Sequence, residues 1–104
     1  MDAKLKDLVQ RLAEVYNPEK IYLFGSRAWG IPTEESDYDI LVELASSELK
    51  PHQRPIAGYV RLSDFDVAVD LVVYTSSELA TRRDDASRFV ARVLRDGLVV
   101  YARA

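Results

Sequence analysis

Hydrophobic residues recur at intervals of three and four at both ends of the chain. This period places them on one face of an α-helix. We expect the first helix to end near Asn17 and Pro18, and the last to stop at Gly97. The apolar positions are Leu5, Leu8, Val9, Leu12, Val15 and Tyr16 in the first helix, and Ala86, Phe89, Val90, Val93 and Leu94 in the last. The pattern therefore predicts two amphipathic helices.

Four short apolar runs between and after these helices predict β-strands. Their sequences are KIYLF (20–24), DYDILVEL (37–44), VAVDLVVYT (67–75) and LVVYA (98–102). The second run is apolar on both faces beyond its entrance, which favours a central place in the sheet.

The segments that connect the predicted strands carry turn and helix signals. SRAW (26–29) predicts a helical turn that Ser26 caps, and Gly30-Ile31-Pro32 ends it. ASSELKPHQRP (45–55) predicts a loop, IAGYVRLSDF (56–65) a weak helix, and Thr75 with Glu78 a capping box. Because helices and strands alternate, we expect one domain over 1–104, an α/β or α+β fold in which helices flank a mixed sheet.

Composition narrows the classes of function. The 104 residues include 14 Lys and Arg against 17 Asp and Glu, and no Cys. A net charge of −3 argues against direct nucleic-acid binding, and the lack of cysteine fits a reducing cytoplasm. No apolar run reaches the roughly 20 residues that span a bilayer, so no membrane association is expected. A chain this small leaves a large second reactant to be bound partly by another chain, in a homo- or hetero-oligomer.

The junction between the first predicted strand and the turn that follows it suits a phosphate group. Gly25 lets the backbone approach a ligand closely, and Ser26 adds a hydroxyl. Arg27 follows directly, where a guanidinium can reach phosphate or simply face solvent. We therefore expect Gly25, Ser26 and Arg27 to bind a nucleotide.

Three aspartates complete the predicted site. The strand period of two sends Asp37 and Asp39 to one face, and neighbouring carboxylates need a cation to neutralise them. Mg²⁺ is the natural choice because it prefers oxygen ligands and is usually held by one or two carboxylates plus substrate phosphates. Asp70 interrupts an apolar strand; if that strand lies beside the second, Asp70 joins the pair to hold two metal ions.

Gly25-Ser26, ten residues, Asp37-x-Asp39 and a later strand aspartate resemble the nucleotidyltransferase signature of the DNA polymerase beta superfamily. Over its whole length the chain resembles the minimal nucleotidyltransferases, the MNT-type antitoxins that pair with HEPN toxins. The resemblance implies that Gly25 and Ser26 hold ATP, that Asp37 and Asp39 bind Mg²⁺, and that Asp70 helps to activate the attacking hydroxyl. It also implies AMP transfer to a hydroxyl, with a tyrosine of a HEPN toxin as the leading acceptor, in a type VII toxin–antitoxin pair.

Alternatives remain at the level of function and of single residues. The chain can instead be a catalytically silent antitoxin that masks its partner by contact, and transfer to a small molecule is a third reading.

The segment SDFD (63–66) imitates SDYD (36–39), which makes Asp64 and Asp66 rivals for the metal role. Trp29 either stacks on a base or packs beneath its loop, and His52 reads as an exposed loop residue. One face of the last helix carries Arg88, Arg92 and Arg95, either solvated or facing an acidic partner.

Overall fold

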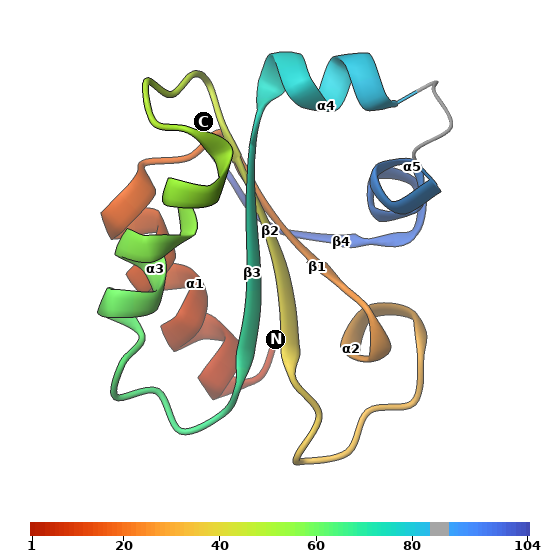
Figure 1. Ribbon diagram of the computed structural model, residues 1–104. Helices are drawn as coiled ribbons and strands as arrows, with labels where there is room; N and C mark the ends of the chain where they lie inside the picture. Colours follow the sequence, from red (N-terminus) through yellow and green to blue (C-terminus); the bar gives the residue numbers. More distant parts are fainter. Residues whose placement is uncertain (84–87) are drawn as a thin grey trace.

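A computed structural model describes residues 1–83 and 88–104 of the chain. A single mixed sheet in the order β3-β2-β1-β4 forms the middle layer, and helices lie on both of its faces (Figure 1). The strands are β1 (Lys20–Phe24), β2 (Tyr38–Leu44), β3 (Val69–Thr75) and β4 (Leu98–Ala102). The helices are α1 (Ala3–Tyr16), α2 (Ser26–Trp29), the 3₁₀ turn η1 (Pro51–Gln53), α3 (Pro55–Arg61), α4 (Ser76–Arg82) and α5 (Arg88–Asp96). The predicted α/β architecture is confirmed.

Strand pairing gives the sheet its mixed character. β1 runs antiparallel to both β2 and β4, whereas β2 and β3 are parallel and joined by the crossover that contains α3. β2 is central, as its two apolar faces predicted. In this register Phe24 lies opposite Asp39, and Asp39 lies opposite Asp70. The pairing therefore brings three positions that are distant in sequence into one row across the sheet.

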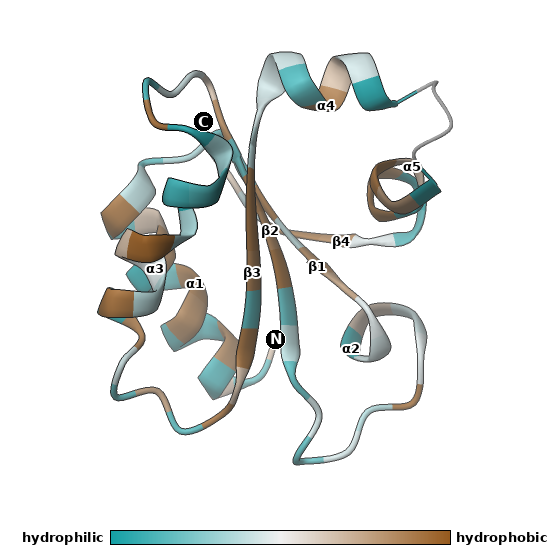
Figure 2. Cartoon of the chain, viewed as in Figure 1, coloured by the Kyte–Doolittle hydropathy of each residue, from teal (hydrophilic) through white to brown (hydrophobic). Residues whose placement is uncertain are grey.

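Each face of the sheet has its own apolar core. α1 and α3 cover one face, and α2, α4 and α5 lie on the other (Figure 1). Fully buried residues on the first side include Leu8, Leu12, Ile21 and Ile40, and on the second Leu41, Val90 and Val93. Figure 2 shows hydrophobic colour along most of β1, β2 and β3, with hydrophilic bands near the lower ends of β2 and β3. The polar bands mark the end of the sheet where the candidate site lies.

The helix ends follow from local chemistry. The Asp2 side chain accepts a hydrogen bond of 2.7 Å from the Leu5 N–H and so begins α1, which stops at Asn17 in a left-handed conformation. Thr75 and Glu78 form the predicted capping box of α4. α5 ends before Gly97 as expected, and its inner face carries Val90 and Val93; Ala86, predicted on that face, lies outside the described residues.

Several predicted boundaries are wrong by a few residues. The second strand begins at Tyr38 rather than 37, the third at Val69 rather than 67, and α3 covers 55–61 rather than the expected 56–65. The predicted 45–55 loop contains η1 and ends at Arg54, whose side chain is buried. Arg54 is held by Glu78, with Nη1 2.6 Å from Oε1. This ion pair gives structural order to a segment whose prolines and polar residues predicted only a loop.

Side chains occupy the outer edge of β3. The Leu71 N–H donates to the Tyr59 hydroxyl at 2.9 Å, and Arg54 Nη1 donates to the Val73 carbonyl at 3.4 Å. The Thr75 N–H donates to Glu78 Oε1 at 2.8 Å. Three backbone groups that face away from the sheet are therefore already paired with side chains.

Candidate functional site

Gly25 ends β1 in a conformation that only glycine adopts readily. Its φ of 76° and ψ of −156° turn the chain directly into α2, whose first hydrogen bonds run to the Gly25 carbonyl from the N–H groups of Ala28 (2.9 Å) and Trp29 (3.0 Å). A β-carbon at Gly25 would lie 2.9 Å from Cγ of Asp39. The glycine thus allows the backbone after β1 to lie directly against an aspartate of β2.

Ser26 is the first residue of α2 and not its cap. Gly25 takes the cap position, and no side chain supplies a capping hydrogen bond. The prediction that Ser26 caps this turn is wrong, because the glycine turns the chain one residue earlier than a serine cap requires. The Ser26 hydroxyl therefore has no capping role at the strand-to-helix junction beside Asp39.

The three predicted aspartates lie at the same end of the sheet. Asp39 and Asp70 are in register on the parallel strands β2 and β3, as the adjacency of these strands predicted. Asp37 is exposed just before β2, and Asp70 is exposed on the edge strand, whereas Asp39 is partly buried. Partial burial, and then the negative charges of Asp70 and Asp37, raise the pKa of the Asp39 carboxyl above its usual value. The three carboxylates therefore form one electrostatically coupled group.

These carboxylates can supply some, but not all, of the ligands that a hard cation needs. Within residues 1–83 and 88–104, no three His, Cys, Asp or Glu side chains form a metal site by themselves. Mg²⁺, however, is usually held by only one or two carboxylates, with phosphates and water completing its shell. Burial is the main cause of the raised pKa of Asp39, and the negative charges of Asp70 and Asp37 add to it; a bound cation would offset both effects by stabilising the ionised carboxylate. The donor set is therefore suited to a metal ion that arrives with a phosphorylated ligand.

Arg27 binds the loop that leads to Asp37. Its Nε donates to the Ser36 carbonyl at 3.0 Å, and its Nη2 donates to the same oxygen at 2.8 Å. Nη2 also lies 3.2 Å from the Thr33 carbonyl and 3.3 Å from that of Glu34, and the guanidinium stacks over the Tyr38 ring at 4.0 Å. A phosphate contact by Arg27 stays a prediction. Sequence reasoning missed these loop contacts, because backbone carbonyls leave no signal in residue identity.

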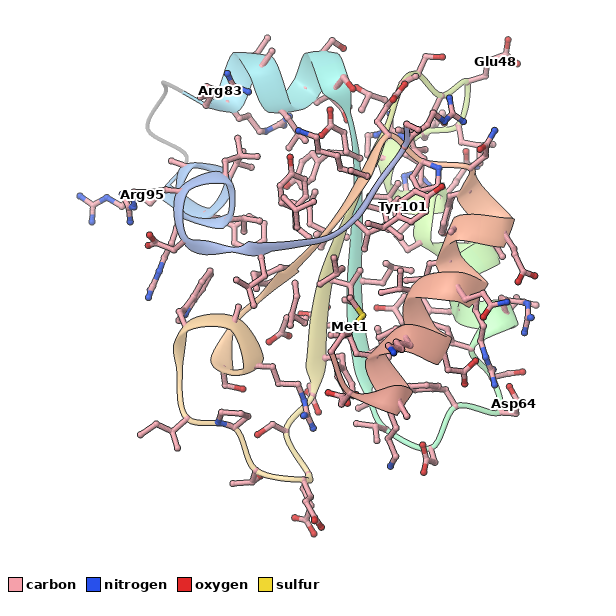
Figure 3. All side chains as sticks on the ribbon, turned by 180° about the vertical axis from the view of Figure 1, so that it is seen from behind. Met1, Glu48, Asp64, Arg83, Arg95 and Tyr101 are labelled. Carbon is pink, nitrogen blue, oxygen red and sulfur yellow. The ribbon has the colours of Figure 1, made fainter. Side chains whose placement is uncertain are left out.

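The rival acidic residues have other partners. Asp66 accepts from Lys4 Nζ at 3.0 Å, and Asp64 pairs with Arg11 Nη1 at 2.5 Å. Asp64 lies on the α1 side of the sheet, away from α2 (Figure 3). The lowered pKa values of both carboxyls follow first from these side-chain hydrogen bonds. SDFD at 63–66 is therefore an ion-paired segment beside α1.

The remaining candidates are mainly structural. Trp29 is partly buried and packs in the second core, with its ring 6.3 Å from that of Phe24 and 4.2 Å from the Arg92 guanidinium carbon. Packing beneath the loop is therefore what the structure shows. His52 is exposed in η1, as expected. Arg95 pairs with Asp96 at 3.0 Å and points outward on α5 (Figure 3).

The comparisons with known proteins agree with this geometry. A family described as "Polymerase beta, Nucleotidyltransferase" matches residues 4–104. The fold is similar to the crystal structure of a candidate nucleotidyltransferase from Sulfolobus solfataricus, with a TM-score of 0.68 and 25% identity over 96% of this chain and 78% of that one. It is also similar to a chain in a crystal structure of a toxin–antitoxin with AMP-PNP, with a TM-score of 0.64 and 27% identity over 94% and 73% of the two chains.

No curated protein matches the chain. Among the helices of residues 1–83 and 88–104, none has the length and apolar character to cross a membrane.

Proposed function

Because the chain belongs to the polymerase beta nucleotidyltransferase family, we propose that it transfers AMP from ATP to a hydroxyl of a partner protein. The observation that carries this proposal is the row formed by the end of β1, Asp39 and Asp70. Gly25 and Ser26 lie at one end of this row, and Asp70 lies at its other end on the edge strand. A donor and an acceptor can therefore bind on opposite sides of Asp39.

Gly25 and Ser26 hold the triphosphate in this proposal. The absent side chain at Gly25 lets the backbone of the turn lie against the Asp39 carboxylate, and the Ser26 hydroxyl can donate a hydrogen bond to phosphate. Asp37 and Asp39 would hold Mg²⁺, with Asp70 sharing in a second ion. When bound, the metal neutralises phosphate and carboxylate charge together.

Asp70 acts as the general base in this proposal. It is exposed on β3, the strand at the edge of the sheet, so a protein hydroxyl can approach it from outside. The acceptor oxygen attacks the α-phosphorus of ATP, the bond to the β-phosphate oxygen breaks, and pyrophosphate leaves. Asp70 accepts the proton of the hydroxyl, and AMP becomes linked to the acceptor by a phosphodiester bond.

The similarity to a toxin–antitoxin structure with AMP-PNP supports a protein acceptor. We propose that this acceptor is a tyrosine of a HEPN-type toxin and that its modification neutralises the toxin. The chain would then be the enzymatic antitoxin of a type VII pair.

The test uses Asp70→Asn, which keeps the size of the side chain but removes the base. The candidate toxin is incubated with ATP, Mg²⁺ and either the parent chain or the variant, and is then weighed by intact mass spectrometry. We expect the parent to add one or more AMP groups and the variant to be slower by about 10²–10⁴-fold, the usual value of a general base.

Asp66→Asn is the matched control, because Asp66 belongs to the imitating motif but pairs with Lys4. It should transfer AMP at the parental rate. If the parent neutralises the toxin and leaves its mass unchanged, the transferase proposal fails and neutralisation by contact replaces it.

A further inference from the structure

The loop from Gly30 to Asp37 is anchored chiefly through one side chain. Within it, the Thr33 N–H donates to Ser36 Oγ at 2.9 Å and the Ser36 N–H donates to the Thr33 carbonyl at 3.1 Å. These bonds close a small turn but do not attach it to the sheet. Ile31 is 95% exposed and so adds little packing. Arg27 supplies the attachment by donating to the carbonyls of Thr33, Glu34 and Ser36.

The shortest of these hydrogen bonds are made to the peptide group between Ser36 and Asp37. The Ser36 carbonyl belongs to the same planar peptide unit as the backbone nitrogen of Asp37, so a hold on that oxygen fixes the start of Asp37. Both Nε and Nη2 of Arg27 donate to it, at 3.0 and 2.8 Å. The position of the first aspartate is therefore set by a side chain two residues beyond Gly25.

The guanidinium is itself held in place. It stacks over the Tyr38 ring at 4.0 Å, and Tyr38 is 2% exposed. The Tyr38 hydroxyl donates to Asp2 Oδ1 at 3.2 Å, and Asp2 caps α1. An arginine suits this task because its planar fork donates several hydrogen bonds in fixed directions while its face rests on an aromatic ring.

We propose that Arg27 is a positioning residue that couples the phosphate-binding turn to the metal-binding aspartates. Arg27 lies on α2, which begins at Ser26 directly after the cap residue Gly25. Its side chain donates hydrogen bonds to the loop that leads to Asp37 and Asp39. A movement of the nucleotide-binding turn would therefore also move the loop that leads to the aspartates. The role rests on the proposed transferase function, and it differs from the predicted contact between Arg27 and phosphate.

Arg27→Ala and Arg27→Lys separate the two roles. Lysine keeps a positive charge that can meet phosphate, but it is a compact point charge and lacks the planar fork. For a positioning role, we expect kcat of AMP transfer to fall about 10–100-fold in both variants, since small misplacements of reacting groups carry penalties of this order. The KM for ATP should change less than about threefold. If Lys restores both constants, Arg27 acts as a phosphate ligand and the positioning proposal is overturned.

Amide hydrogen exchange of residues 30–37 provides a readout that does not depend on activity. Both Arg27 variants should exchange at least about tenfold faster in this loop, while the core strands keep their protection. Unchanged exchange would overturn the proposal even if activity fell. If the parent transfers no AMP, the proposed function fails, and the exchange rates still decide whether Arg27 holds the loop.

Two further variants control the comparison. Ser36→Ala removes the hydrogen bond from the Thr33 N–H to Ser36 Oγ but leaves Arg27 and the phosphate site untouched, and it should give a smaller loss of kcat in the same direction. Arg11→Ala removes an arginine that also makes several polar contacts, on α1 with Asp7 and Asp64. It should leave kcat, KM and exchange of the 30–37 loop at parental values; a similar loss in Arg11→Ala would show a general destabilisation and overturn the specific role.

Discussion

Asp39→Asn should make the metal-free protein more stable. Asp39 lies beside Asp70 in the register of two adjacent strands, and its pKa is raised by burial and then by Asp70 and Asp37. In-register residues lie about 5 Å apart, so two unit charges repel by about 0.8 kcal/mol in water and about 3 kcal/mol at an effective dielectric constant of 20. Asp70 is exposed, which places the repulsion toward the lower value. We expect a gain of about 1 kcal/mol.

The assay is thermal unfolding in EDTA at low salt and pH 8. For a domain of this size, about 1 kcal/mol corresponds to a rise in Tm of about 4–8 °C. The gain should shrink in 1 M NaCl, where the screening length falls to about 3 Å. An Asp39→Asn variant that is no more stable than the parent at low salt would refute the reasoning.

The pH dependence gives an independent check. Because the folded-state pKa of Asp39 is raised, the folded chain binds this proton more tightly than the unfolded chain. The protonated Asp39 carboxyl therefore adds to the free energy of unfolding at low pH, and this contribution is lost as pH rises through the folded-state pKa. The difference between Asp39→Asn and the parent should therefore vanish well below that pKa and be complete above it. Asp66→Asn is the control, since its carboxylate is paired with Lys4 and its neutralisation should not stabilise the fold.

Two other substitutions test the site and the fold. Gly25→Ala should cost about 1–3 kcal/mol because of the φ of 76°. It should also weaken Mg-ATP binding at least about tenfold by displacing Asp39, as measured by calorimetry; parental affinity would contradict the close approach. Glu78→Ala should cost about 3 kcal/mol in urea unfolding, because it leaves the buried Arg54 guanidinium without its carboxylate. The Arg54 hydrogen bond lowers the pKa of Glu78, so this stabilisation is lost as pH falls through the folded-state pKa, and an unchanged unfolding free energy would contradict it.

Local patterns were sufficient to predict most of the fold. The period of the apolar residues predicted α1 and α5, and short apolar runs predicted all four strands, because burial on one or two faces leaves a direct record in sequence. The spacing of Gly25 and Asp39 also predicted that they lie together, and the antiparallel pairing of β1 with β2 places Phe24, the residue before Gly25, opposite Asp39. Asp70 needed one assumption about strand adjacency, which the parallel pairing of β2 with β3 confirms.

The errors concern interactions that depend on the tertiary arrangement. Arg54 looked like a loop residue because nothing near it in sequence shows that Glu78 would lie beside it. Ser26 was predicted as a cap from its identity, whereas the backbone of Gly25 decides where α2 begins. The guanidinium of Arg27 is engaged by carbonyl oxygens, which every residue has, so sequence could not reveal its partners.

The occupied edge of β3 limits how another protein can reach Asp70. An added strand would need the Leu71 and Thr75 N–H groups and the Val73 carbonyl, which already bind Tyr59, Glu78 and Arg54. The sheet consequently resists extension on this side, and the same feature protects an otherwise open strand from aggregation. For the proposed transfer, an acceptor hydroxyl would therefore arrive on a helix or loop that brings its side chain over the edge, and its recognition would depend on side-chain contacts rather than strand pairing.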